Sequence, residues 1–138
     1  MPGLDQQTIL ADVPKFSQAE IIVTYQKQIF LLGDGTVYRV NTNLEKLAEG
    51  LSDWNYNLAD NSFVFVAFGE LNFYNFGSGQ IQLITRLGAS PVNPRLNTNL
   101  NYAFYLSDNN VSAVELDRRD RQNQYQLYAG TDIKKFTL

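Results

Sequence analysis

The chain has 138 residues, a formal net charge of −3 and only 18% charged residues, which fits one globular domain rather than a disordered segment. It contains neither histidine nor cysteine. Ser-His-Asp and Cys-His catalytic sites, disulfides and the usual protein ligands of zinc, haem and iron–sulfur centres are therefore excluded. The acidic balance argues against binding to a phosphate backbone, so we expect no nucleic-acid partner.

Nothing in the sequence predicts a membrane span or a targeting segment. The longest near-apolar run, residues 63–68, has the length of a strand. The first seven residues lack the basic and apolar regions of a signal peptide. The absence of cysteine fits either a reducing cytosol or a surface protein without thiols, so composition leaves the localisation open.

Apolar residues recur at a period close to two along most of the chain, which predicts strands. Residues 21–25 and 29–32 are short runs rich in β-branched and aromatic residues. Asp34–Gly35 predicts a tight hairpin turn, because both residues tolerate positive φ, and residues 36–41 predict the returning strand. Residues 44–51 are the best helix candidate, but they make barely two turns, so we prefer a short outer strand.

The same order of strands and turns recurs twice more along the chain. Strands are expected at 53–57, 63–68, 70–76 and 80–85 in a second unit, and at 92–97, 101–106, 111–116 and 124–129 in a third. Anchored on Val37, Leu71 and Val111, the three units lie 34 and 40 residues apart. A period of roughly 40 residues with four short strands per unit is typical of β-propeller blades.

We therefore predict an all-β chain of about three four-stranded antiparallel β-propeller blades that form a partial propeller. The expected parts are an N-terminal segment or linker at 1–19, blades at 20–51, 52–90 and 91–130, and at 131–138 the first strand of a next blade or a closing strand. The second strands are apolar on both faces, as expected of blades that stack face to face. A β-sandwich, which also has many short strands and regular turns, is the alternative.

Three segments carry motifs of a known family: residues 70–80, 111–120 and 123–130. They resemble the TolB-like and WD-repeat-like propeller blades of bacterial envelope proteins, in particular the C-terminal propeller of PEGA-domain-containing proteins. Blades of this family usually carry a Ser-Pro-Asp-Gly turn before the second strand, and residues 58–61 and 97–100 depart from it. The resemblance implies a scaffold or binding role without a reaction, in the bacterial cell envelope or outside the cell.

About three blades are too few to close a ring, because closed propellers use roughly 4–8 blades. An open stack leaves apolar blade faces exposed, and such faces usually mark an interface. The chain is then a piece of a longer protein, or half of a ring completed by a second copy, or an open arc that packs face to face with identical chains.

The candidate interaction surface comprises Trp54, Tyr56, Arg118, Arg119 and Arg121. The tryptophan, next to an aspartate, could stack on a sugar, although a tryptophan on an inner strand usually serves core formation. The arginines could hold an anion, although neighbouring acids neutralise much of their charge and a solvated hairpin tip is the preferred interpretation.

The acidic residues are interpreted as surface groups. Glu115 and Asp117 would share one face of a strand, as paired glycosidase carboxylates do, but no recognisable pocket accompanies them. The loop that starts at Asp108 lacks the glycine that an EF-hand needs at its sixth position. We predict no catalytic, cofactor-binding or metal-binding residues.

These features predict a non-enzymatic β-propeller module that acts as a protein–protein interaction or assembly scaffold. Its partner is a second protein or further copies of itself. The alternative is an extracellular carbohydrate-binding or carbohydrate-active β-domain, supported by Trp54, the 8 tyrosines and the carboxylates.

Overall fold

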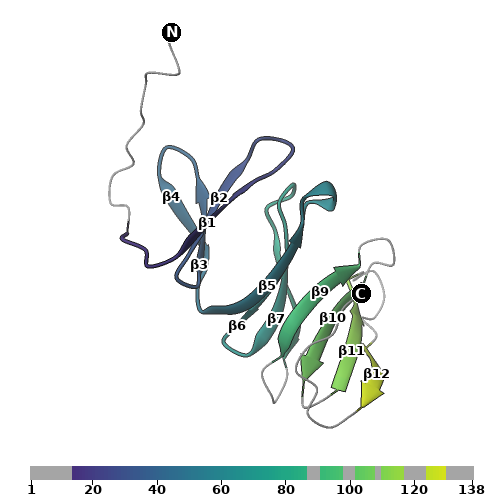
Figure 1. The fold of residues 1–138 in the computed structure, drawn as a ribbon. Helices are drawn as coiled ribbons and strands as arrows, with labels where there is room; N and C mark the ends of the chain where they lie inside the picture. Colours follow the sequence, from purple (N-terminus) through teal and green to yellow (C-terminus); the bar gives the residue numbers. More distant parts are fainter. Residues whose placement is uncertain (1–13, 87–90, 98–101, 108–109, 117–123, 130–138) are drawn as a thin grey trace. The chain divides into compact units, whose positions relative to one another are not determined.

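The computed structural model describes residues 14–86, 91–97, 102–107, 110–116 and 124–129. Within these ranges every strand belongs to one of three four-stranded antiparallel sheets, and no α-helix occurs (Figure 1). The predicted all-β class with three four-stranded antiparallel units is therefore confirmed. The chain divides into two compact units, Met1–Glu49 and Gly50–Leu138.

The first unit contains the first sheet, whose strands follow one another in the order of the chain. They are β1 (Ala19–Val23), β2 (Ile29–Gly33), β3 (Thr36–Val40) and β4 (Leu44–Ala48). The helix considered for residues 44–51 does not form, because β4 pairs along β3. The predicted Asp34–Gly35 turn is confirmed: Gly33 pairs with Thr36, and the two turn residues have φ of 49° and 78°.

The second unit contains the other two sheets, again in chain order within each sheet. The second sheet consists of β5 (Leu51–Asn57), β6 (Ser62–Ala67), β7 (Glu70–Asn75) and β8 (Ile81–Arg86), with a 3-10 turn η1 (Leu58–Asp60) after β5. The third sheet consists of β9 (Val92–Asn97), β10 (Tyr102–Ser107), β11 (Asn110–Glu115) and β12 (Gln124–Ala129). Leu51, placed at the end of the predicted first blade, is the first residue of β5.

Two local differences from the predicted elements have clear backbone reasons. The strand expected at 63–68 ends at Ala67, because Phe68 and Gly69 form the two-residue turn into β7 with φ of 50° and 75°. In the segment 58–61, which departs from the family's usual turn, Leu58–Asp60 form η1. The side chain of Asn57 accepts a hydrogen bond from the N–H of Ala59 at 3.0 Å, and Asn61 ends the turn with φ of 54°.

The three sheets share one register. Val37, Leu71 and Val111 are each the second residue of the third strand, and beside each one the pairing with the fourth strand shifts by a bulge. The pair that closes the central hairpin also recurs, as Gly33–Thr36, Ala67–Glu70 and Ser107–Asn110. Positions in the three sheets can therefore be matched one to one, and such matched positions are called equivalent below.

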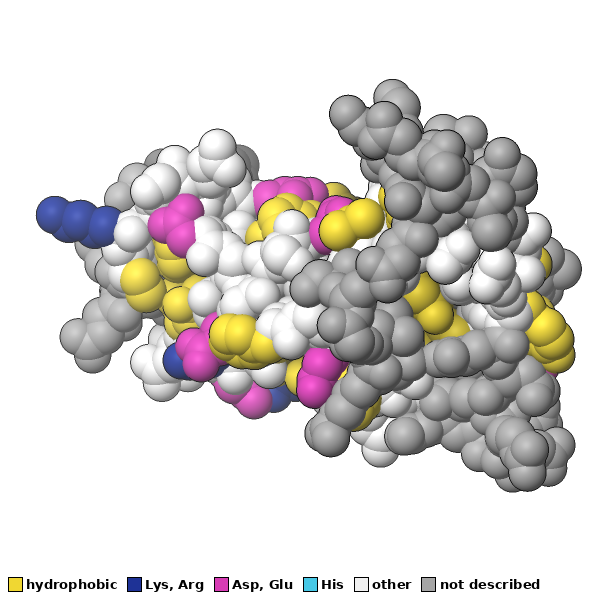
Figure 2. Space-filling view, turned by 90° about the horizontal axis from the view of Figure 1, so that it is seen from below, with side chains coloured by type: hydrophobic (Ala, Val, Ile, Leu, Met, Phe, Trp, Pro, Cys, Tyr) yellow, Lys and Arg dark blue, Asp and Glu magenta, His cyan; other side chains and the backbone are white. Residues whose placement is uncertain are grey.

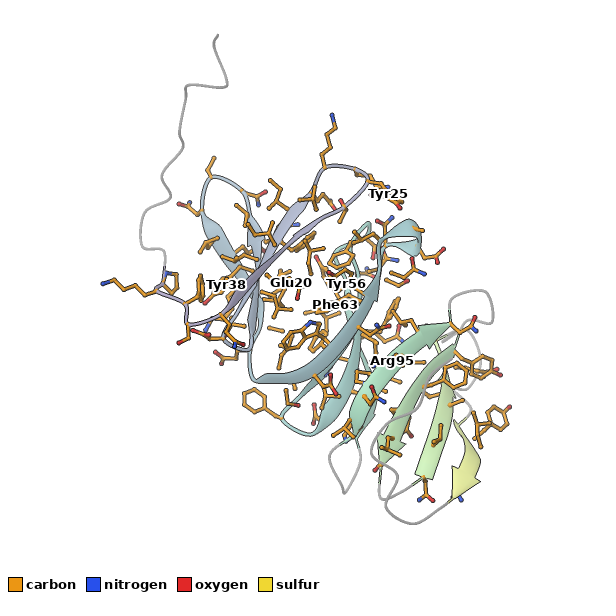
Figure 3. All side chains as sticks on the ribbon, in the orientation of Figure 1. Glu20, Tyr25, Tyr38, Tyr56, Phe63 and Arg95 are labelled. Carbon is orange, nitrogen blue, oxygen red and sulfur yellow. The ribbon has the colours of Figure 1, made fainter. Side chains whose placement is uncertain are left out.

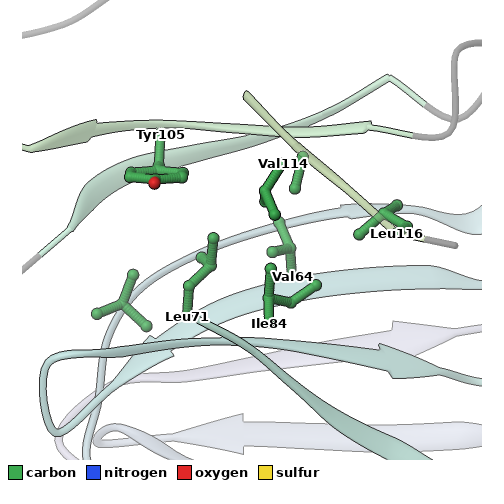
Figure 4. Packing of buried hydrophobic residues seen from close by; sticks show 8 residues of the cluster. Val64, Leu71, Ile84, Tyr105, Val114 and Leu116 are labelled. Atoms are coloured by element: carbon green, nitrogen blue, oxygen red, sulfur yellow. The ribbon is translucent and has the colours of Figure 1, made fainter. Parts of the chain in front are cut away.

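The core of the second unit lies between the second and third sheets (Figure 4). The second sheet contributes Val64, Val66, Leu71 and Ile84, and the third contributes Ala103, Tyr105, Val114 and Leu116; Phe73 and Leu96 pack against them. This set is called the inter-sheet cluster. The strand β6 is buried along its whole length, because its other face carries Phe63 and Phe65, whose rings stack at 5.3 Å.

Candidate functional site

The face of the third sheet opposite the inter-sheet cluster is apolar and partly open. It carries a hollow of about 240 Å³ lined by Tyr102, Phe104, Ala113, Tyr125 and Leu127. These five residues define the outer face of the third sheet. Tyr125 and Leu127 on β12 are 46% and 55% exposed. A group of large apolar side chains exposed side by side usually marks an interaction site. Figure 2 shows hydrophobic side chains that reach the described surface in several places.

Aromatic rings dominate this hollow. The ring of Tyr102 lies 6.3 Å from that of Phe104 and 6.2 Å from that of Tyr125. Its phenol donates a hydrogen bond to Oε1 of Glu115 at 3.3 Å. Partial burial raises the pKa of the Tyr102 phenol, and the negative charge of Glu115 raises it further. The phenol is therefore a neutral donor at ordinary pH.

The first sheet also has an apolar face that is open. Alternate residues of β1 and β2 place Ile21, Val23, Ile29 and Leu31 on it, and these four define the apolar face of the first sheet. Ile21, Val23 and Ile29 are 68%, 49% and 42% exposed. The opposite face of this sheet, with Ile22 and Phe30, is buried.

The residues singled out from the sequence are only partly brought together. Trp54 and Tyr56 lie half-buried on one face of β5, paired with Phe65 and Phe63 on β6. The ring of Tyr56 contacts that of Phe63 at 6.4 Å (Figure 3). Arg118, Arg119 and Arg121 lie outside the described residues.

Asp53 and Trp54 do not form a common site. Successive residues of a strand point to opposite faces, and the carboxylate of Asp53 binds across to β9 through the N–H of Asn93. Of the considered carboxylate pair, Glu115 accepts a hydrogen bond from the phenol of Tyr102, and Asp117 lies outside the described residues. Among the residues that the structure describes, no three acidic groups gather in a way that could hold a metal ion.

A second, polar hollow of about 370 Å³ lies at the β7–β8 hairpin. It is lined by Phe73, Asn75, Ser78, Gln80, Ile81 and Gln82. The side-chain oxygen of Asn75 accepts hydrogen bonds from the N–H groups of Gly77 and Ser78 at 2.8 and 2.9 Å, which fixes the turn between β7 and β8. The amide of Gln82 donates to the carbonyl of Leu116 at 3.4 Å.

Sequence reasoning did not single out Leu127, Phe104 or the exposed isoleucines of the first sheet. A usable signal was present, because the spacing of Val37, Leu71 and Val111 matches each position with its equivalents. Phe104 is equivalent to Val64, and Leu127 to Ile84, so two positions of the inter-sheet cluster recur on the outer face of the third sheet.

In the part of the chain that the structure describes, no helix has the length and apolar character needed to cross a membrane.

Comparison with known proteins identifies a similar fold but no family. No protein-family model and no curated protein matches the chain. A solved structure of an auxiliary nutrient binding protein from Bacteroides thetaiotaomicron VPI-5482 is similar, with a TM-score of 0.53 and 14% sequence identity. The similarity covers 88% of this chain and 34% of that one. The chain thus spans about a third of the length of that protein, and at this identity the likeness concerns the fold alone.

Proposed function

We propose that the chain is a non-enzymatic β-propeller module that acts as a protein–protein interaction or assembly scaffold, and that the outer face of the third sheet is its docking surface. One observation carries the proposal. Phe104, Ala113 and Leu127 of this face are equivalent to Val64, Phe73 and Ile84, which pack against the third sheet; Phe104 and Ala113 are buried as well, but Leu127 is open whereas its equivalent Ile84 is buried.

The chemistry of this face suits a protein partner. Aromatic residues are enriched in the cores of protein interfaces, where charged residues are depleted. Full burial of a leucine side chain is worth about 1.5–3 kcal/mol, so covering this face is favourable. The phenol of Tyr102 already binds Glu115, which leaves the rings and Leu127 as the groups that a partner would contact.

The strand order within each sheet supports the propeller arrangement. Each sheet is built from one continuous stretch of chain in sequential order, as in a blade, whereas β-sandwiches typically connect their strands by Greek keys. The face-to-face contact of the second and third sheets through the inter-sheet cluster is also what neighbouring blades require.

A photoreactive amino acid at Leu127 tests the docking surface. In cells that naturally produce the protein, irradiation should link this position to a protein, either another molecule or a second copy. The same amino acid at Ala59, an exposed residue of η1, is the matched control and should give no discrete product. Failure of the Leu127 variant to form any protein adduct above this control would contradict the proposed function.

Binding of a carbohydrate nutrient is a second candidate function, favoured by the polar hollow at the β7–β8 hairpin. That hollow combines the ring of Phe73 with amide and hydroxyl side chains, the groups that stack on and hydrogen-bond to sugars. The similar solved structure is that of a nutrient binding protein. Calorimetric titration with soluble oligosaccharides tests this function: heat of binding that is lost in Gln80→Ala, but kept in Leu127→Ala, would support it.

A further inference from the structure

We infer that the outer face of the third sheet binds the apolar face of the first sheet of a second copy of this chain. The inference rests on the proposed function and names its partner. It is drawn from the contact that the chain already makes between its second and third sheets, because that contact shows which two faces fit each other.

The outer face of the third sheet repeats apolar positions by which the second sheet contacts the third. In the inter-sheet cluster the second sheet presents Val64, Val66, Leu71, Phe73 and Ile84. By the shared register, their equivalents in the third sheet are Phe104, Leu106, Val111, Ala113 and Leu127. All five are apolar and lie on the side opposite the cluster. The outer face of the third sheet therefore has the same apolar character as the face by which the second sheet contacts the third.

The apolar face of the first sheet repeats most of the positions by which the third sheet contacts the second. In the inter-sheet cluster the third sheet contributes Ala103, Tyr105, Val114 and Leu116, and Leu96 packs against them. Their equivalents in the first sheet, in the same order, are Ile29, Leu31, Val40, Thr42 and Val23, all of them apolar except Thr42. The first sheet therefore carries the complementary kind of face, and Val23 and Ile29 are open.

Each chain thus carries one face of each kind with exposed apolar side chains: Leu127 on the outer face of the third sheet, where Phe104, Leu106 and Ala113 are buried, and Val23 and Ile29 on the first sheet. A second copy supplies both missing partners at once, so the contact is heterologous: the third sheet of one copy meets the first sheet of the other. Two copies form a closed assembly if the rotation allows, and otherwise copies add in an open row.

Paired charge substitutions test this contact by analytical ultracentrifugation. The wild-type chain should show a mass that rises with concentration. Val23→Glu in the first sheet and Leu127→Glu in the third should each weaken self-association by about 100-fold or more, because each buries an unpaired carboxylate in the contact. Both side chains are about half exposed, so the folded chain tolerates the charge, which circular dichroism verifies. Ala59→Glu, at an exposed position of η1, should leave self-association unchanged.

An equimolar mixture of the two single variants gives the sharpest result. Val23→Glu retains an intact third sheet and Leu127→Glu an intact first sheet, so the mixture should form a one-to-one dimer although each variant alone is monomeric. A wild-type chain that stays monomeric at all concentrations would overturn the inference, and so would self-association that only one of the two substitutions disrupts. If the photoreactive residue at Leu127 then links to another protein, the proposed function stands without this partner; if it links to nothing, both fail.

Discussion

The carboxylate of Asp53 joins the first strands of two sheets. Its Oδ2 accepts a hydrogen bond from the backbone N–H of Asn93 on β9 at 2.6 Å, and its Oδ1 accepts one from the N–H of Trp54 at 3.0 Å. Asn93 has a positive φ of 56°, which an asparagine adopts more readily than most residues. The neighbouring Asn55 repeats the connection, accepting from the N–H of Leu96 at 3.3 Å.

Replacing Asp53 by alanine should lower the free energy of unfolding by about 1.5–3 kcal/mol, because a charged acceptor is lost from a partly buried backbone N–H. Denaturation by urea measures the loss. Glu49→Ala is the matched control: its exposed carboxylate accepts a hydrogen bond from Lys46 at 3.0 Å, and an exposed ion pair is worth about 0–1 kcal/mol. Equal losses in the two variants would contradict the structural role of Asp53.

Ile84 and Leu127 occupy equivalent positions but should respond differently to truncation. Ile84→Ala removes a buried member of the inter-sheet cluster and should cost about 2–5 kcal/mol of stability through lost burial and the cavity left behind. Leu127→Ala should cost the monomer less than about 1 kcal/mol, because the side chain is more than half exposed. Thermal unfolding of dilute samples makes the comparison. A large loss from Leu127→Ala under these conditions would mean that this face is covered within a single chain.

At Gly50, directly before β5, the positive φ matters more than the absence of a side chain. It has φ of +74°, and a Cβ there would overlap the ring of Phe68. That ring is 77% exposed and can move away, so the backbone strain dominates. Gly50→Ala should cost about 1–2 kcal/mol. The same loss of stability should appear when Phe68 is already alanine. A double-mutant cycle of Gly50→Ala and Phe68→Ala should therefore give a coupling energy below about 0.5 kcal/mol. A larger coupling energy would show that the overlap with the Phe68 ring, and not the backbone strain, causes the loss.

The sequence alone was sufficient for the features that depend on local chemistry. Asp34–Gly35 predicted its turn because few residues adopt two successive positive φ angles. Val37, Leu71 and Val111 marked the repeat because the same order of apolar runs and turns surrounds each of them, and in the structure a bulge recurs beside each one. Phe68 misled, since phenylalanine is not a turn residue and continues an apolar run; the hairpin forms there because Gly69 and the pairing of β6 with β7 determine it.

Exposure of the candidate site could not be predicted in this way. Ile84 and Leu127 look alike in sequence, and their burial differs only because a further sheet covers one of them. Trp54 and Asp53 are neighbours in sequence yet lie on opposite faces of β5, which follows once the strand is known. Residues 44–51 were ambiguous because two helical turns contain too few residues to show whether the apolar residues follow a helix or a strand period. In the structure, pairing of β4 with β3 makes residues 44–48 of this segment a strand.

Stability should fall at high pH through Tyr105, whose phenol lies in the inter-sheet cluster. Burial raises its pKa above the ordinary 10, while a hydrogen bond with Ser112 partly opposes the shift. Because the folded pKa is the higher one, the contribution is fully present below pH 10 and is lost as pH rises through the folded pKa. Tyr105→Phe should cost about 1 kcal/mol at neutral pH, where the hydrogen bond is lost, but its melting temperature should fall less than that of the wild type between pH 9 and about pH 12. Tyr25→Phe, at an exposed position, is the control and should lose melting temperature between pH 9 and about pH 12 as the wild type does. If the melting temperatures of the wild type, Tyr105→Phe and Tyr25→Phe fall in parallel, the Tyr105 phenol does not cause the loss of stability at high pH.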